Sequence, residues 1–346
     1  MNNLYAHAGV NIDKGNEVVR RIKKSVKSTH IKAVLTGIGH FGGLYDIGKI
    51  LKSYKHPILV QSIDGVGTKL SVARMAKKYD SVGEDIVGHS CGDIIAMGAR
   101  PLTFLDYVAN EILVPEEMEA MVSGMAKACK KAGVAIIGGE TAEMPGIYMK
   151  GEHDIAGCIT GVVEKNKIIT GEKIKEGDIM FGFVSSGLHT NGFSLARKLI
   201  FEIGKYKINS RIPELKSTIG EVLLKVHTNY TNPVLEMLDN KVNIRGIAHI
   251  TGGGFIENIP RILPKNLDAE ITKGSWPMLP IFPFMQKIGN VGEREMYTAF
   301  NMGIGLVLVM PHSEKEKMQK ILKKYPTFHI KKIGKIIKGK GKVILK

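Results

Sequence analysis

The chain has 346 residues, of which 44% are apolar and 24% charged, so its length allows two domains and its composition excludes a disordered chain. Its formal net charge of +16 comes from lysines spread along the sequence, without the interleaved basic and aromatic residues typical of single-strand-binding proteins. We therefore interpret the charge as a lysine-rich surface that collects anionic substrates, and we expect no nucleic-acid partner.

The sequence contains no evident targeting or membrane segment. Residues 1–13 lack the apolar core of a signal peptide, and no apolar run reaches the roughly 18 residues needed to cross a bilayer. Cys91, Cys129 and Cys158 lie in apolar segments and lack C-x-x-C spacing. This pattern indicates buried, reduced thiols, so we expect a cytoplasmic protein without a membrane partner.

The first elements predict a helix followed by a glycine-rich loop. Residues 16–27 repeat apolar side chains at helical spacing, and Lys23 lies beside that apolar face. Residues 37–43 then contain four glycines in seven positions, with Ile38 and Phe41 among them. Such a glycine density excludes a helix or a regular strand, and the apolar residues favour a packed, substrate-facing loop over a bare linker.

The stretch at residues 61–69 reads Gln-Ser-Ile-Asp-Gly-Val-Gly-Thr-Lys and follows a short apolar run, so we expect it at the end of a buried strand. Asp64 can hold a hard cation through oxygen, and Lys69 can neutralise phosphate charge. The spacing does not fit the G-x-x-x-x-G-K-[ST] phosphate loop. Asp-Gly is also an ordinary turn sequence, so both interpretations of this stretch remain open.

Residues 70–77 and 85–99 predict two helices. Asp93 lies next to the buried stripe of the second helix, which is otherwise poor in charge. A carboxylate on a buried side needs a partner. That partner could be a cation shared with Asp64, or a neighbouring lysine.

The first half continues with a strand at residues 102–108, a helix at 116–132 and a strand at 134–137. This second buried strand runs into Gly-Gly-Glu-Thr-Ala-Glu-Met-Pro-Gly at residues 138–146, a glycine turn followed by acids and a hydroxyl, as at residues 61–69. Polar groups at strand ends are where α/β proteins form ligand sites. A strand at residues 155–164 completes this half.

A domain boundary is predicted near residues 166–177, where Lys, Glu, Gly and Asp dominate, and we expect domains over residues 1–168 and 169–346. A strand at 179–184 leads to Ser-Ser-Gly-Leu-His-Thr-Asn-Gly and then a helix at 193–203. Small polar residues before a helix can present N–H groups to an anion. His189 could bind phosphate or donate a proton there, or it could only cap the turn.

The pattern of strand, glycine loop and helix recurs at residues 247–259, and a strand at 303–310 and a helix at 313–324 close the second half. Both halves therefore predict a mixed α/β (α+β) fold. The G-x-G-x-x-G at residues 37–42 and the G-x-S-x-G at residues 88–92 lack the strand-to-helix setting of a dinucleotide fingerprint or a serine nucleophile elbow. Glycine loops, carboxylates and lysines together indicate phosphoryl chemistry on a small anionic substrate, which depends on positioning and charge neutralisation.

These motifs resemble the phosphoribosylformylglycinamidine cyclo-ligase family, also called the aminoimidazole ribonucleotide synthetases. The similarity covers nearly the whole chain in order: Tyr5 with residues 8–12, then residues 37–43, 64–70, 104–107, 138–146, 186–192 and 249–254, and finally residues 295–297 with 300–301. The run at 138–146 is highly specific to that family. The run at 64–69 is shared with a superfamily of ATP-using relatives.

The resemblance implies an ATP-dependent ring closure in purine biosynthesis. ATP would phosphorylate the formyl oxygen of formylglycinamidine ribonucleotide, the amidine nitrogen would attack the activated carbon, and loss of phosphate would leave 5-aminoimidazole ribonucleotide. It also implies Mg²⁺ and two α/β domains, of which the amino-terminal one binds ATP. Amino-terminal strands from two subunits would form a barrel across a homodimer.

The same resemblance implies roles for individual residues. Asp64 and Asp93 would hold the metal with Glu140 as a possible third ligand, and the catalytic residues would be His189, Lys23 and Asp64. The residues that would contact ATP and its phosphates are Gly37, Gly39, Gly42, Gly43, Gly65, Gly67, Thr68, Lys69, Gly139 and Thr141. Those that would face the ribonucleotide are His189, Thr190, Asn191, Gly252, Gly253 and Gly254.

Three positions depart from the family pattern. Gly92 stands where asparagine usually precedes the helix aspartate, Ile63 where threonine commonly precedes Asp-Gly, and His40 replaces a glycine of the first loop. Gly92 removes a possible amide contact to nucleotide or metal, and His40 could add a phosphate contact or only cap the loop. The alternative is another superfamily member, such as a thiamine-monophosphate kinase or a hydrogenase-maturation or selenophosphate-synthesising protein. The runs at 104–107 and 140–146 count against it.

Overall fold

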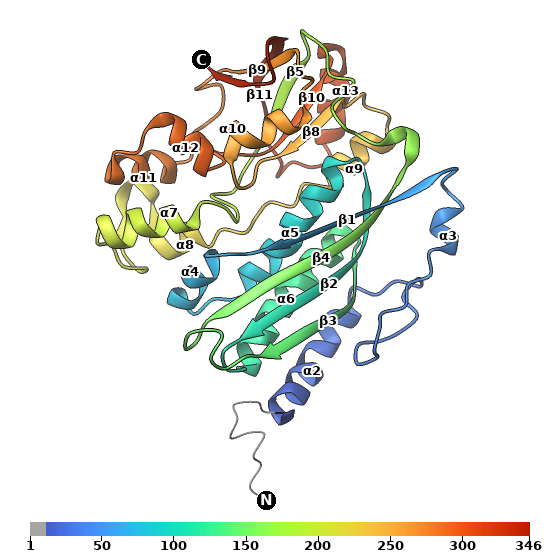
Figure 1. The fold of residues 1–346 in the computed structure, drawn as a ribbon, viewed down its shortest axis with the longest axis vertical. Helices are drawn as coiled ribbons and strands as arrows, with labels where there is room; N and C mark the ends of the chain where they lie inside the picture. The colour runs from blue at the N-terminus through green and yellow to red at the C-terminus, as the bar shows by residue number, and fades with distance from the viewer. Residues whose placement is uncertain (1–11) are drawn as a thin grey trace, which may run out of the picture. The chain divides into compact units, whose positions relative to one another are not determined.

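The computed structural model describes residues 12–346, and the chain divides into two compact units (Figure 1). The first unit contains Met1–Ile94 and Arg100–Lys165, and the second contains Ile95–Ala99 and Asn166–Lys346. The part of the family resemblance at Tyr5 and residues 8–11 lies outside the described residues. Across residues 12–346, no helix has the length and apolar character needed to cross a membrane.

The first unit is built on a four-stranded sheet. Its strands lie in the order β1-β4-β2-β3, with β4 antiparallel to both of its neighbours and β2 parallel to β3. The strands are β1 (Pro57–Gly65), β2 (Arg100–Asn110), β3 (Ala135–Glu143) and β4 (His153–Glu164). The helices are α2 (Ile12–Lys27), α3 (Gly48–Leu51), α4 (Lys69–Ala76), α5 (Asp80–Ala96) and α6 (Pro115–Ala132).

The two faces of this sheet differ in chemistry. Helices α5 and α6 run along one face (Figure 1), where Phe104 of β2 is fully buried. The next residue, Leu105, lies on the opposite face in a row with Cys158 and Ile63, because successive strand residues alternate between faces. Ile63 is 72% exposed and Leu105 40% exposed. The first unit therefore has a helix-covered face and an exposed apolar face, which we call the open face.

Strands β1 and β3 extend further than the sequence predicts. Strand β1 pairs with β4 as far as Gly65, and β3 pairs with β2 as far as Glu143, so the two glycine-containing stretches are largely strand and not loops. Glycine is required at one of these positions by packing: a Cβ at Gly139 would lie 2.3 Å from the Asp106 Oδ1 atom. Ladder pairing and this close contact outweigh the turn preference of Gly-Gly.

Helices α5 and α6 cross at two glycines. A Cβ at Gly83 of α5 would lie 1.9 Å from the Met121 carbonyl oxygen, and one at Gly124 of α6 would lie 2.0 Å from the Asp80 carbonyl oxygen. Both distances are far inside van der Waals contact. The backbones can approach this closely only because neither glycine has a side chain.

The second unit contains a six-stranded sheet in the order β12-β9-β11-β5-β10-β8 and a small sheet of β6 and β7. Its strands are β5 (Ile179–Val184), β6 (Arg211–Ile212), β7 (Ser217–Thr218), β8 (Gly246–His249), β9 (Leu267–Ile271), β10 (Ile304–Met310), β11 (Ile330–Lys338) and β12 (Val343–Leu345). Its helices are α7 (Phe193–Arg197), continued by a π-helix over Lys198–Ile203, then α8 (Ile219–Leu223), α9 (Thr231–Asp239), α10 (Gly254–Asn258), α11 (Ile281–Gly289), α12 (Glu293–Ala299) and α13 (Lys315–Leu322).

Strand β10 sets the geometry of this second sheet. It is antiparallel to both β5 and β8. The pairs at its beginning are Ile304 with Val184 of β5 and Leu306 with His249 of β8. Strands β5 and β8 are therefore parallel to each other, and their carboxyl ends lie at the same edge of the sheet. The two polar loops that follow them, at residues 185–192 and 250–254, start from that edge.

The predicted secondary structure agrees with most of these elements. The predictions of a helix at residues 116–132 and a strand at 179–184 are confirmed as α6 and β5. Helix α5 starts earlier than predicted, at Asp80, and ends at Ala96. Cys91 and Cys129 are buried as expected, whereas Cys158 is only partly buried because it belongs to the open face.

We expect Gly124→Ala to lower the free energy of unfolding by about 1–3 kcal/mol, because the added methyl group forces α5 and α6 apart. The measurement is chemical denaturation of the two proteins side by side. Gly15→Ala in α2 is the matched control, since no heavy atom lies within 4 Å of a Cβ there. That substitution inside a helix should stabilise by roughly 0.5–1 kcal/mol. A Gly124→Ala protein as stable as the parent would contradict the close crossing.

Candidate functional site

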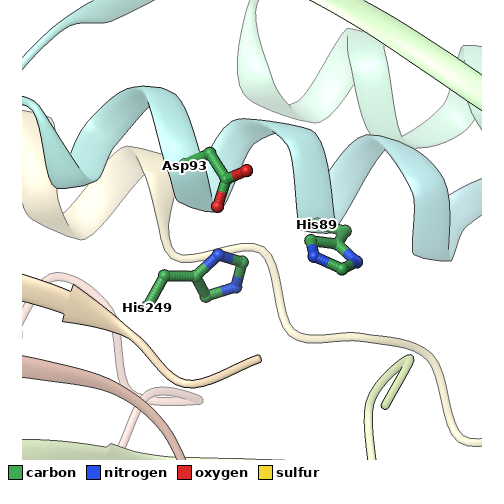
Figure 2. Close-up of side chains that lie close together, drawn as sticks. All are labelled: His89, Asp93 and His249. Atoms are coloured by element: carbon green, nitrogen blue, oxygen red, sulfur yellow. The ribbon is translucent and has the colours of Figure 1, made fainter. Parts of the chain in front are cut away.

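Helix α5 carries three polar side chains at intervals of one turn: Asp85, His89 and Asp93. Residues four positions apart on a helix share one face. Figure 2 shows His89 and Asp93 on neighbouring turns of this helix. Asp85 is fully buried and His89 is nearly so, whereas Asp93 is half-buried. Helix α5 thus presents a row of charged and titratable groups along one face.

Each of these groups meets a polar partner from β1 or from the start of α4. The Ser62 hydroxyl donates to Asp93 Oδ2 at 2.9 Å, and His89 Nε2 lies 2.8 Å from Asp64 Oδ2. Two residues along a strand span about 6.6 Å and four residues along a helix span about 6 Å. The spacings of β1 and α5 therefore match, so that Asp64 and Ser62 of β1 meet His89 and Asp93 on neighbouring turns of the helix.

Asp64 and Asp93 were predicted as metal ligands, and the structure places them on the same side of β1 and α5. His89 stands between them: it contacts Asp64, and one of its ring nitrogens lies within 4.8 Å of an Asp93 carboxylate oxygen. Carboxylate oxygens suit Mg²⁺, so this donor set fits the ion that the family resemblance implies. The sequence analysis missed His89, although its spacing of four residues from Asp93 was a usable signal.

Glu140 does not join this group within one chain. It pairs with Tyr107 on β2, at the sheet edge opposite to β1, so roughly three strand spacings, or about 14 Å, separate it from the row of Asp64. It also lies on the open face, whereas Asp64 faces α5. The helix-facing side of the sheet therefore carries Asp64 opposite His89 and Asp93 of α5, but not Glu140.

Lys69 is buried and paired. Its Nζ atom lies 2.6 Å from Asp85 Oδ2, and both side chains are fully inaccessible to solvent. Burial lowers the pKa of Lys69, while the Asp85 carboxylate acts in the opposite direction. In this structure the lysine anchors the beginning of α4 to α5 through this pair.

The loop at residues 37–43 is exposed. Phe41 is fully exposed, so the expectation that it packs inside the loop is wrong. A Cβ at Gly37, Gly39 or Gly42 would meet no atom within 4 Å, whereas one at Gly43 would lie 2.3 Å from the Ile137 carbonyl oxygen. The loop is thus anchored on β3 at its end and open elsewhere, and Lys23 of α2 is also exposed.

The substrate-facing residues predicted in the second unit are brought together at the edge where β5 and β8 end. A Cβ at Gly252 would lie 3.4 Å from Asn191 Oδ1, so the two polar loops adjoin. The Asn258 side-chain amide donates to the carbonyl oxygens of Thr251, Gly252 and Gly254, at 3.3, 3.1 and 2.9 Å. One buried asparagine therefore holds the whole 251–254 loop in shape.

His189 belongs to a cluster of three buried histidines. Its backbone is left-handed, with φ of 63°, and its ring stacks on His227 with a centroid distance of 4.0 Å. His227 Nδ1 lies 3.3 Å from Thr190 Oγ1, and His227 Nε2 lies 3.3 Å from His249 Nε2. His249, drawn in Figure 2, ends strand β8. The sequence analysis did not single out His227 or His249, because this contact joins segments far apart in the chain.

The His189 ring is only 1% exposed. Its Nε2 atom accepts from the backbone N–H groups of Ser186 and Thr228, each at 3.4 Å, so the neutral ring carries its proton on Nδ1. Burial favours a role in shaping the 185–192 loop over direct contact with substrate. Thr190 and Asn191 follow it in that loop, and Asn191 is the more accessible of the two.

One protein family matches both halves of the chain. The AIR synthase related protein family matches in two parts, its N-terminal domain at residues 46–163 and its C-terminal domain at residues 175–346. The chain belongs to the AIR synthase related family. Among solved structures, thiamine-monophosphate kinase from Stenotrophomonas maltophilia aligns with a TM-score of 0.70 at 16% identity, covering 95% of this chain and 96% of the other. At that identity the match shows a shared fold.

Two relatives within the AIR synthase related family are far more similar in sequence. The phosphoribosylformylglycinamidine cyclo-ligase of Alkaliphilus metalliredigens is 47% identical, with 99% of this chain and 97% of the relative covered. The enzyme of the same name from Bacillus thuringiensis subsp. konkukian is 46% identical with the same coverage. Escherichia coli HypE, whose structure aligns with a TM-score of 0.67 over 96% of this chain and 93% of the other, is only 16% identical.

The burial of Asp106 on the helix-covered face of the first sheet can be tested through the pH dependence of stability. Burial raises its pKa to about 7 from an ordinary value of 3.8, so the native carboxyl keeps its proton over a pH range where the unfolded chain has lost it. Native stability should therefore fall as pH rises from about 4 to about 7. We expect Asp106→Asn to have a higher Tm than the parent at pH 8, and the advantage to shrink at pH 5.5.

Thermal denaturation at the two pH values measures this effect. The exposed Asp239→Asn serves as the control and should shift the Tm little and equally at both. A gain of 1 kcal/mol corresponds to roughly 2–4 °C. An Asp106→Asn difference that is independent of pH would show that this carboxyl is ionised in the native protein.

Proposed function

We propose that the protein catalyses the ATP-dependent ring closure of formylglycinamidine ribonucleotide to 5-aminoimidazole ribonucleotide, with ADP and phosphate released, in purine biosynthesis. The observation that carries this proposal is 47% identity to a phosphoribosylformylglycinamidine cyclo-ligase over 99% of the chain. Kinase and hydrogenase-maturation relatives share the fold at 16% identity and so support that fold alone.

In the proposed reaction, the formyl oxygen takes the terminal phosphoryl group of ATP and becomes a good leaving group. The amidine nitrogen then bonds to the formyl carbon, the carbon–oxygen bond breaks, and phosphate departs as a proton is lost from nitrogen. The protein's contribution to such a reaction is mainly orientation and neutralisation of charge. Mg²⁺ would supply charge neutralisation on the ATP phosphates when bound.

The metal and ATP roles are assigned to the first unit. Asp64 and Asp93 would hold Mg²⁺ through oxygen, and Ser62 orients Asp93 through its hydrogen bond. The exposed Gly67 and Thr68 precede α4, where backbone N–H groups at a helix start favour phosphate. The open part of the 37–43 loop and the exposed Lys23 are further candidates for ATP contacts.

Substrate recognition is assigned to the second unit. Asn191 and the backbone of residues 252–254 adjoin at one sheet edge, and amide and backbone groups can hold a ribonucleotide phosphate by hydrogen bonds. His189 would act as a positioning residue for Thr190 and Asn191 because its ring is buried behind them.

We further propose a homodimer formed through the open face of the first sheet, located in the cytoplasm. Leu59, Ile63, Leu105 and Tyr107 are exposed on this face by 61%, 72%, 40% and 37%. Exposed apolar patches of this kind mark interaction surfaces. A second copy applied to the same face would complete the barrel that the family resemblance implies.

The turnover assay tests the function directly. Purified protein with Mg²⁺-ATP should release ADP and phosphate only when formylglycinamidine ribonucleotide is present, and mass spectrometry should detect 5-aminoimidazole ribonucleotide in equal amount. Thiamine monophosphate serves as the comparison substrate, since its phosphorylation would favour the kinase alternative. A folded protein that forms no cyclised product from fresh substrate would refute the proposal.

The dimer has its own test. We expect Ile63→Asp to convert the protein to a monomer in light scattering at micromolar concentration, because it places a charge in the buried centre of the proposed interface. Ile203→Asp is the matched control, because Ile203 is 49% exposed and belongs to the second unit, not to the first sheet. If the parent protein is itself monomeric, or if Ile63→Asp leaves a dimer intact, the open face is not the interface.

A further inference from the structure

Two buried asparagines of the second unit, Asn258 and Asn301, direct their side chains at the backbone of the two substrate loops. These loops are residues 185–192, which follow β5, and residues 250–254, which follow β8. Asn258 is 2% exposed and Asn301 is 3% exposed. Burial of an amide costs free energy unless its polar atoms are hydrogen-bonded, so the partners of these two side chains show what each one holds in place.

Asn258 holds the 250–254 loop in a tight curve. Its amide donates to three carbonyl oxygens of the loop, those of Thr251, Gly252 and Gly254. The curve needs left-handed backbone, which Gly253 supplies with φ of 93° and Gly254 with φ of 55°. Within residues 12–346, the N–H groups of Gly252 and Gly253 make no hydrogen bond, so these donors are available to an anionic ligand.

Asn301 holds the start of the 185–192 loop in a similar way. Its Nδ2 atom donates to the Gly187 carbonyl oxygen at 2.9 Å, and its Oδ1 atom accepts from the Gly303 N–H group at 2.9 Å. The Ser185 hydroxyl lies 3.2 Å from the same Oδ1 atom, and the Ser185 N–H group donates to the Gly303 carbonyl oxygen at 2.8 Å. Asn301 therefore ties this loop to the turn that precedes β10.

The segment at residues 297–303 supports both substrate loops. A Cβ at Gly192 would lie 2.5 Å from the Phe300 ring, and one at Gly254 would lie 2.1 Å from the Tyr297 carbonyl oxygen. Such distances leave no room for a side chain, so both loops lie directly against this segment. The relative position of the two loops is therefore fixed by contacts within the second unit.

We propose that Asn258 and Asn301 are positioning residues for the ribonucleotide, because they hold the two substrate loops in the geometry that binds its phosphate before the substrate arrives. Both amides are buried behind the loops and do not contact the substrate. With the loops already ordered, binding costs little conformational entropy, which favours affinity. Loss of either asparagine frees glycine-rich backbone to adopt other conformations. This inference rests on the proposed function, since it takes the two loops as the ribonucleotide site.

Binding of formylglycinamidine ribonucleotide to the full-length protein, measured by calorimetry without ATP, tests the inference together with steady-state kinetics. Asn258→Ala and Asn301→Ala should each raise the Kd and the KM for the ribonucleotide about tenfold or more, because the loop carbonyl groups lose their donor. The KM for ATP should change less than about threefold, because ATP is assigned to the first unit. Asn258→Asp keeps the side-chain shape without the donor and should weaken ribonucleotide binding at least as much as Asn258→Ala.

Asn240→Ala is the matched control. The Asn240 amide also donates to a backbone carbonyl oxygen, that of Glu236 at 2.8 Å, but it does so at the exposed end of α9. This variant should leave the Kd and KM for the ribonucleotide unchanged. Thermal melts establish that each variant is folded, and if one alanine variant unfolds, the other asparagine gives the same test on a separate loop.

A merely structural role gives a different result. It would lower the folded fraction, and with it the number of binding sites and kcat, while the Kd and KM for the ribonucleotide stayed at the parent values; that result overturns the inference. A parent protein that binds the ribonucleotide but forms no cyclised product would refute the proposed function, whereas the change in Kd would still test the two asparagines. A parent that neither binds nor cyclises the ribonucleotide would refute both.

Discussion

The alignment of helix α5 with strand β1 is the constraint on which the first unit depends. The fully buried contact between Lys69 and Asp85 fixes one end of this alignment, and removal of either partner would leave an uncompensated buried charge, at a cost of about 3–5 kcal/mol. Two further contacts, His89 with Asp64 and Ser62 with Asp93, follow along the same helix face. A slip of one residue in β1 would turn Ser62 and Asp64 to the open face and abolish the site.

The alternation of side chains along the strands also gives the two faces of the first sheet different chemistry. The carboxylates of Asp64 and Asp106 point toward the helices. Each is preceded by an apolar residue, Ile63 or Leu105, that lies on the exposed open face. A single four-stranded sheet therefore presents polar groups on one face and an exposed apolar surface on the other. The glycines at its centre permit this: at Gly157 a Cβ would lie 2.3 Å from the Phe104 ring.

In the second unit, polar loops are brought together by strand pairing. Strands β5 and β8 are parallel because both pair with β10, so loops distant in sequence emerge side by side. Buried polar groups then fix the shapes of these loops, with Asn258 holding residues 251–254 and the histidine cluster lying under residues 189–191. The hydrogen bonds of Asn258 Nδ2 and His189 Nε2 with the backbone tie these side chains to one loop geometry.

The sequence by itself determined the mixed α/β class, most helices and strands, the family, and the glycine and acid motifs, because periodicity and local spacing are properties of short segments. It could not determine which polar groups meet. Glu140 has the same local setting as Asp64 in sequence, yet the strand order β1-β4-β2-β3 puts them at opposite edges of the sheet. Lys69, expected at the ATP phosphates, is buried against Asp85, a contact that no local pattern indicates. His89 and His227 gained partners only through folding. Contacts across a sheet depend on strand order and register, which long-range packing decides and no local pattern records.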